Sequence, residues 1–212
     1  MGILEKWKLT SEELDEIMQQ SPSLRGFTFG YVSEYKLKKI WFSDNRVNNV
    51  IKPDDHDRTK KGDIAFLYRG YTMRVEVKSL QTNSIKQEHN SFTGIFQCDA
   101  SDRRQVRLPN GEFVQTTCLV IGEFDIVAVC LFQYTDDWIF AFAKNADLPR
   151  ASKRYKEDIR KYLLASSIRI TWPLQPPFSL DPFPILDAII HDREGGAYHP
   201  TIVINPTPQN NC

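Results

Sequence analysis

The sequence has no excess of charge and no long apolar segment, and each absence excludes a class of protein. Its 212 residues carry 27 basic and 27 acidic side chains, so no overall charge draws the chain to nucleic acid or to an anionic membrane. The longest apolar run, residues 126–132, has the length of a strand, whereas a membrane-spanning helix needs about 20 residues. The N-terminal segment is charged and lacks the apolar core of a secretory signal. We therefore expect a cytoplasmic protein that does not enter a membrane.

Several motifs for metal, nucleophilic and nucleotide chemistry are also missing. The cysteines, Cys98, Cys118, Cys130 and Cys212, form no CxxC pair, and most lie in apolar segments, so we expect reduced core residues. The histidines show no HxxxH spacing, and neither a G-x-S-x-G elbow nor a P-loop occurs. A cysteine or histidine zinc site, a disulfide framework and P-loop nucleotide chemistry are therefore not expected.

The composition is that of a globular chain, with 41% hydrophobic and 25% charged residues. We expect one domain over residues 1–200 and a flexible C-terminal tail over 201–212. Thr10 and Glu13 form a possible capping box before a short helix. A second helix is predicted over about 31–42, after Gly26 and Gly30 interrupt the pattern, and residues 43–62 are predicted to be a polar loop.

From residue 62 the hydrophobic pattern changes from helical to alternating. Strands are predicted on both sides of Arg69-Gly70 and of Asn110-Gly111, and a strand buried on both faces is predicted over 124–132. Helices are predicted over 152–166 and 185–191, within an otherwise irregular C-terminal third. The predicted class is α+β, with a central mixed or antiparallel sheet flanked by helices.

The first predicted hairpin carries an acid on each strand. If Arg69-Gly70 forms the loop, paired positions sum to 139, so Asp63 lies opposite Glu76. Opposite residues share a face, and Lys78 points the same way because side chains alternate along a strand. The other face would be entirely apolar or aromatic, which supports this register. Its residues are Ile64, Phe66, Tyr68, Tyr71, Met73, Val75 and Val77.

Two carboxylates that face each other across a ladder repel unless a positive charge lies between them. Mg²⁺ would supply that charge, because it takes a few carboxylate oxygens and retains several waters, and Mn²⁺ is expected to substitute. The ammonium of Lys78 could then position a water or help to deprotonate it, while the ion polarises a phosphate ester. Asp63, Glu76 and Lys78 therefore favour phosphodiester hydrolysis.

A second explanation fits the same residues without a metal. A salt bridge from Lys78 to one acid, with Arg74 serving the other, would also satisfy both carboxylates. Another Glu-x-Lys triplet, residues 34–36, falls in a predicted helix, where residues two apart do not share a face. Spacing alone leaves the metal site and the ion-pair network as alternatives.

Residues 62–79, GDIAFLYRGYTMRVEVKS, resemble the signature of the PD-(D/E)XK nuclease superfamily, to which many type II restriction endonucleases belong. The resemblance implies a restriction-endonuclease-like, α/β/α-like core with the element order αβββαβ. It also implies that Asp63 and Glu76 ligate a metal, that the Val77 carbonyl completes the site, and that Lys78 is the catalytic lysine. Residues 96–132 look similar to uncharacterised bacterial restriction-endonuclease-like proteins.

The superfamily often adds a glutamate from an upstream helix, and Glu34 is the candidate here. It shares a helical face with Leu37 and Trp41, and an acid on an apolar stripe needs a reason. The alternative is a first-turn glutamate that the helix dipole favours. The signature's Pro-Asp is replaced by Gly62-Asp63, while a literal Pro-Asp at residues 53–54 lies in the predicted loop.

Local charge favours a polyanionic substrate. Residues 58–107 contain 10 Lys or Arg and 5 Asp or Glu, an excess that suits phosphate contacts. Side chains able to contact bases or phosphates form two groups, each of which also fits a solvated loop. The first group is Gln81, Asn83, Lys86, Gln87, His89 and Asn90, and the second is Arg103, Arg104 and Arg107.

Together these features predict a Mg²⁺-dependent endonuclease of the type II restriction kind that cuts double-stranded DNA. A homodimer is expected, because one such site cuts one strand and a duplex break requires two. One alternative is a repair or junction nuclease on the same core. The other is a non-catalytic nucleic-acid-binding or assembly protein, in which Asp63, Glu76 and Lys78 form only an ion-pair network.

Overall fold

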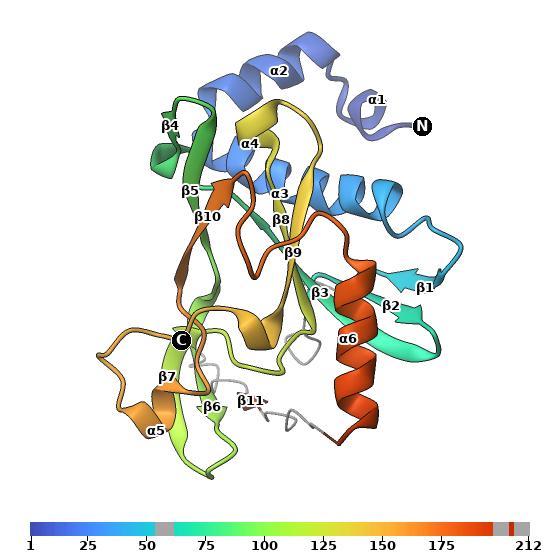
Figure 1. Cartoon of the computed structure of the whole chain (residues 1–212). Helices are drawn as coiled ribbons and strands as arrows, with labels where there is room; N and C mark the ends of the chain where they lie inside the picture. Colours follow the sequence, from blue (N-terminus) through green and yellow to red (C-terminus); the bar gives the residue numbers. More distant parts are fainter. Residues whose placement is uncertain (54–61, 197–203, 206–212) are drawn as a thin grey trace.

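The structure is a computed structural model that describes residues 1–53 and 62–196, together with the backbone of 204–205 (Figure 1). Its centre is a five-stranded sheet with the strand order β1-β2-β3-β8-β9. These strands span Val47–Ile51, Ile64–Tyr68, Tyr71–Ser79, Ile126–Cys130 and Phe140–Lys144. β3 and β8 run parallel, and the other neighbours run antiparallel. The predicted α+β class with a mixed sheet flanked by helices is confirmed.

The β2–β3 hairpin has the predicted register. Tyr68 pairs with Tyr71, and Ile64 pairs with Val75. The apolar residues of both strands alternate into one buried cluster, so the polar residues between them point to the opposite face. The buried set comprises Ile64, Phe66, Tyr68, Met73, Val75 and Val77, with Tyr71 packed against it.

β8 is buried on both faces, as its continuous apolar run predicts. Ile126, Ala128 and Cys130 belong to the same cluster as the hairpin. Val127 and Val129 belong to a second cluster on the other side of the sheet. The sheet therefore separates two hydrophobic cores.

Two helices cover the first core, α3 (Pro22–Ile40) and α6 (Phe183–Glu194), anchored by the fully buried Leu37 and Leu186 (Figure 1). The prediction that α3 begins near residue 31 is wrong, because Gly26 and Gly30 lie inside it. Both glycines face open space, where the backbone stays helical at a cost of about 1 kcal/mol each. α6 extends the helix predicted over 185–191.

A second sheet, of order β10-β5-β4, covers the other core. Its strands span Ser167–Trp172, Ser91–Gln97 and Lys86–Glu88, which the sequence pattern left irregular or polar. Phe96, Ile168 and Ile170 are buried there, so tertiary packing rather than local pattern stabilises these strands. This face departs from the α/β/α-like expectation because a sheet takes the place of a helical layer.

The connection between the parallel strands also departs from the αβββαβ order. The chain leaves β3 and reaches β8 through a 3₁₀ turn, η1 (Thr82–Ser84), and the strands β4 to β7. β6 (Asp99–Arg107) and β7 (Phe113–Cys118) form the hairpin predicted around Asn110-Gly111. The crossover is therefore built from β-structure instead of a helix.

The C-terminal part differs from prediction in one of its helices. The helix predicted over 152–166 is reduced to α5 (Glu157–Arg160), because Leu163 and Leu164 form β-bridges with Val120 and Arg150. Of the expected tail, residues 201–212, the structure describes β11 (Ile204–Asn205), which pairs with β6. The rest of that segment lies outside the described residues.

The N-terminal elements are α1 (Ile3–Trp7) and α2 (Ser11–Gln20). The predicted capping box is confirmed, since Thr10 Oγ1 accepts a 3.2 Å hydrogen bond from the Glu13 N–H and the Glu13 carboxylate accepts one of 2.8 Å from the Thr10 N–H. β1 forms within the predicted loop 43–62, whose residues 54–61 lie outside the described part. The remaining short elements are α4 (Phe132–Thr135) and the 3₁₀ turn η2 (Asn145–Asp147).

The cysteines have the predicted environment where they are described. Cys98, Cys118 and Cys130 are buried free thiols, and Cys212 falls outside the described residues. Within residues 1–53 and 62–196, we find no helix with the length and apolarity required to cross a membrane.

Candidate active site

Asp63 lies where β2 begins and β3 continues beyond it. Its Oδ2 accepts a 2.7 Å hydrogen bond from the Val77 N–H, and its own N–H donates to the Val75 carbonyl at 2.8 Å. In an extended strand the N–H and C=O of one residue point to the same side, so the Val77 carbonyl also points toward Asp63. The carboxylate and the Val77 backbone therefore meet at one edge of β3.

Gly62 explains the departure from the Pro-Asp signature. Its φ of +79° lies in the left-handed region, and a Cβ atom there would come within 3.0 Å of the Val75 carbonyl oxygen. Proline is restricted to φ near −65°, so it cannot adopt this conformation. The turn that presents Asp63 to β3 therefore requires glycine. Asp54, of the literal Pro-Asp, lies outside the described residues.

Glu76 and Lys78 share the face of β3 opposite the helices, as predicted. The Lys78 Nζ lies 2.7 Å from Glu76 Oε1, and the two side chains are 20% and 13% exposed, respectively. Burial works against the charge on Lys78, but Glu76 and Asp63 outweigh it and raise the pKa of the ammonium. Lys78 therefore stays protonated at neutral pH, which suits it to donate and to position rather than to deprotonate a water.

Among the described residues, the effects that raise the pKa of Asp63 outweigh those that lower it. Burial, followed by the charge of Glu76, raises its pKa to about 8, against the opposing effects of Lys78 and the Val77 N–H. The alternative in which Arg74 serves this acid is wrong, because the Arg74 N–H donates to Asp125 at 2.7 Å and its guanidinium faces the same carboxylate. The other part of that alternative, an ion pair between Lys78 and Glu76, is present.

Glu34 approaches the same site from α3. Its charge also contributes to the raised pKa of Asp63, and its carboxylate lies 2.6 Å from the Lys52 Nζ. The first-turn explanation is wrong, since α3 begins at Pro22 and Glu34 lies well inside it. Among the described residues, however, no three His, Cys, Asp or Glu side chains gather closely enough to hold a metal by themselves.

The donor set nevertheless fits a hard divalent cation. Asp63 and Glu76 offer carboxylate oxygens, and Val77 offers a carbonyl that points to the same edge. Mg²⁺ is usually held by one or two carboxylates, with waters and substrate phosphate oxygens completing its shell. A site of two acids and one carbonyl therefore suits Mg²⁺ better than a closed cage of protein ligands would.

The first predicted DNA-contacting group lies directly beyond the C-terminal end of β3. Gln81, Asn83 and Lys86 are all exposed, as are Gln87, His89 and Asn90 around the β4–β5 turn. The Gln81 N–H donates to the Ile95 carbonyl at 2.8 Å, which fixes this segment against β5. The backbone of this group is therefore held by β5 and begins three residues after Lys78 in the sequence.

The second predicted DNA-contacting group is split between the surface and the interior. Arg103 and Arg107 are exposed on β6, but Arg104 points inward and forms a two-pronged ion pair with the buried Glu123. Arg104 also donates to the Cys118 carbonyl at 3.2 Å. Because neighbouring strand residues face opposite sides, Arg104 does not share the exposed side of Arg103, and the prediction that Arg104 contacts DNA is wrong.

The two exposed groups lie at opposite ends of the molecule, with β4 at one end and the β6–β7 hairpin at the other (Figure 1). Cys98, between β5 and β6, lies beside Lys78 and Glu76, and burial raises the pKa of its thiol to about 12. Asp63, Glu76 and Lys78 therefore lie between the two groups. The sequence carries no signal for this position of Cys98, since a lone cysteine has no pairing pattern.

Comparisons with known proteins add no relative: no family model, no curated protein and no solved structure matches the chain.

Proposed function

We propose that this chain is a metal-dependent endonuclease of the PD-(D/E)XK kind, which hydrolyses phosphodiester bonds in double-stranded DNA as type II restriction enzymes do. The observation that carries the proposal is the undercompensated Asp63 carboxylate beside Glu76 and Lys78. A half-buried acid whose pKa is raised to about 8 is an unfavourable arrangement unless a cation binds there.

Each residue has a role that follows from its chemistry. Asp63, Glu76 and the Val77 carbonyl would hold Mg²⁺ or Mn²⁺, which supplies positive charge to polarise the scissile phosphate. The Lys78 ammonium orients a water and stabilises charge that develops on the phosphate oxygens. Glu34, held by Lys52, adds negative charge near Asp63 and strengthens the attraction for a cation.

The duplex would lie across the site and contact both exposed groups. Gln81, Asn83 and Lys86 are suited to base edges and phosphates at one end, and Arg103 and Arg107 to phosphates at the other. Arg104 is left out of this interface because Glu123 binds its guanidinium.

A homodimer would bring two such sites to one duplex, and α3 offers a surface for it. Leu24, Phe27, Tyr31 and Tyr35 follow one another at helical spacing, and 43% to 73% of each is exposed. These four side chains form one exposed apolar stripe along the helix, the kind of surface that marks a site of protein association. A two-fold axis would pack this stripe on its own copy.

A non-catalytic nucleic-acid-binding or assembly protein is the second candidate, and the Lys78–Glu76 ion pair favours it. In that case the ion pair would stabilise the fold and take no part in catalysis. A repair or junction nuclease would use the same residues on a different DNA structure.

Incubation of the purified protein with a mixture of duplex DNAs, with Mg²⁺ or with EDTA, separates these functions. Discrete Mg²⁺-dependent fragments are expected for the restriction-type enzyme. A smear, or cutting confined to branched substrates, would favour the other nucleases. DNA that is bound but left intact with Mg²⁺ and with Mn²⁺ would contradict the nuclease proposal and favour the binding protein.

A further inference from the structure

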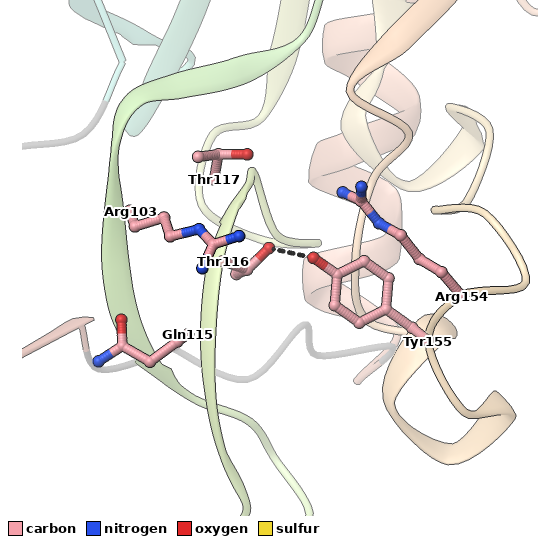
Figure 2. A pocket seen from close by; sticks show the side chains of 6 residues that line it. All are labelled: Arg103, Gln115, Thr116, Thr117, Arg154 and Tyr155. Carbon is pink, nitrogen blue, oxygen red and sulfur yellow. Dashed lines mark hydrogen bonds between the residues drawn. The ribbon is translucent and has the colours of Figure 1, made fainter.

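A polar pocket of about 290 Å³ lies between the β6–β7 hairpin and the segment that leads into α5 (Figure 2). Arg103 and Arg154 enter it from opposite sides, as Figure 2 shows. Its other lining residues are Gln115, Thr116, Thr117 and Tyr155, so every lining side chain is polar and none is acidic.

Hydrogen bonds between the β6–β7 hairpin and the α5 segment fix the walls of the pocket. The Thr116 and Tyr155 hydroxyls lie 2.8 Å apart in a hydrogen bond that joins the hairpin to the α5 segment. Thr116 Oγ1 also accepts a 2.9 Å hydrogen bond from the Cys118 N–H, and the Arg154 guanidinium lies 5.1 Å from the centre of the Tyr155 ring. Arg103 and Arg154 are both exposed.

The surroundings are basic as well. Residues 150–161 contain six Lys or Arg and two Asp or Glu, and Arg107 lies on the same hairpin as Arg103. Guanidinium groups bind phosphate through paired, charge-assisted hydrogen bonds, and hydroxyl and amide groups complete such sites. The lining therefore matches one phosphate group with two flanking cations.

We propose that this pocket holds a backbone phosphate of the DNA duplex and anchors it away from Asp63, Glu76 and Lys78. The inference rests on the proposed function for its ligand, since it takes DNA as the substrate. The anchor would fix the register of the duplex without contacting the scissile group, because phosphate contacts position a protein on DNA and base contacts specify the sequence.

The test is duplex binding by fluorescence anisotropy in EDTA, so that the metal plays no part, with R103A/R154A compared with wild type. We expect the variant to bind about 10-fold or more weakly at ~0.1 M salt, with a salt slope reduced by about one. The control K153A/K156A removes two charges from the same segment outside the pocket lining and should lose less than about three-fold. Melting curves of both variants verify that they fold.

The assignment is overturned if R103A/R154A binds the duplex like wild type, or no more weakly than the control. A wild type that does not bind DNA at all would also overturn it. If inorganic phosphate raises the melting temperature of wild type but not of R103A/R154A, while duplex binding is equal, the pocket is a small-anion site instead.

Cleavage assays keep this proposal separate from the nuclease. At limiting DNA, R103A/R154A should cut more slowly than wild type in proportion to its weaker binding, whereas the control K153A/K156A should cut within a few-fold of wild type. DNA binding that depends on the pocket in a protein that never cuts would leave the anchor in place and contradict the nuclease. If R103A/R154A cuts as fast as wild type at limiting DNA, the result contradicts the phosphate anchor and leaves the nuclease proposal in place.

Discussion

Ionisation of a half-buried carboxyl group beside a second carboxylate raises the free energy of the folded chain, and Asp63 is such a group. Its pKa is raised to about 8, first by burial and then by Glu76, while Lys78 bonds to Glu76 at 2.7 Å. Unfavourable charge of this kind is typical of functional sites, where a ligand restores the balance.

Substitution D63N should therefore stabilise the protein in EDTA. In wild type the folded chain retains a proton on Asp63 that the unfolded chain loses above about pH 4, so the free energy of unfolding falls as pH rises from about 4 to about 8. Asparagine can still accept the Val77 N–H bond, and we expect a gain of about 1–3 kcal/mol at pH 8 and less at pH 5. Chemical denaturation at both pH values measures it. A loss of stability at pH 8 would contradict the account.

Substitution K78A should abolish cleavage and leave duplex binding nearly unchanged. Removal of one preorganised cationic group typically lowers the rate about 10²–10³-fold. Single-turnover cleavage and anisotropy, measured on the same preparation, give the two quantities. A K78A protein that cuts at close to the wild-type rate would remove Lys78 from the proposed mechanism.

Arg103 and Arg104 should differ in stability although they are neighbours. R104A leaves the buried Glu123 without its partner, a change that typically costs about 3–5 kcal/mol. R103A removes an exposed side chain on the opposite side of β6 and should cost about 1 kcal/mol or less, the range of a surface ion pair. Urea unfolding of the two variants provides the comparison, and equal values would contradict the inward placement of Arg104.

At the scale of elements, the sequence predicted those strands whose pattern of apolar and polar residues is set by burial. The β2–β3 register was predictable because a shift of one residue would place charged side chains on the buried face. β8 was predictable from its continuous apolar run. β5, β10 and the shortened α5 were not predictable in this way. Their backbones pair with distant segments, as in the bridge between Leu163 and Val120, and no local pattern records such a partner.

The exposed stripe on α3 makes a prediction for assembly. Phe27 is 73% exposed, so F27D should leave the fold intact and shift the proposed dimer to a monomer. F113D is the matched control, because Phe113 is 52% exposed on β7 and lies outside the stripe. Analytical ultracentrifugation gives the masses. A wild-type monomer, or an F27D protein of unchanged dimer mass, would exclude this interface.

At the scale of the whole molecule, the candidate site lies where the central sheet meets the second sheet. Asp63 lies where β2 begins, beside β3, and Cys98 brings the β5–β6 junction against Lys78. The acids and the lysine were predictable from one hairpin, because that hairpin is local in sequence. The second sheet over them and the pocket at Arg103 and Arg154 depend on contacts between distant segments, so they were not predictable.

The most direct measurement of the central claim is calorimetric titration of Mn²⁺ into wild type and D63N at pH 7. The account predicts one site per chain in wild type, with a proton released as the ion replaces it on Asp63, and no saturable site in D63N. Repeating the titration in two buffers of different ionisation enthalpy counts that proton. Absence of binding to wild type, or equal binding to D63N, would contradict a cation site formed by Asp63 and Glu76.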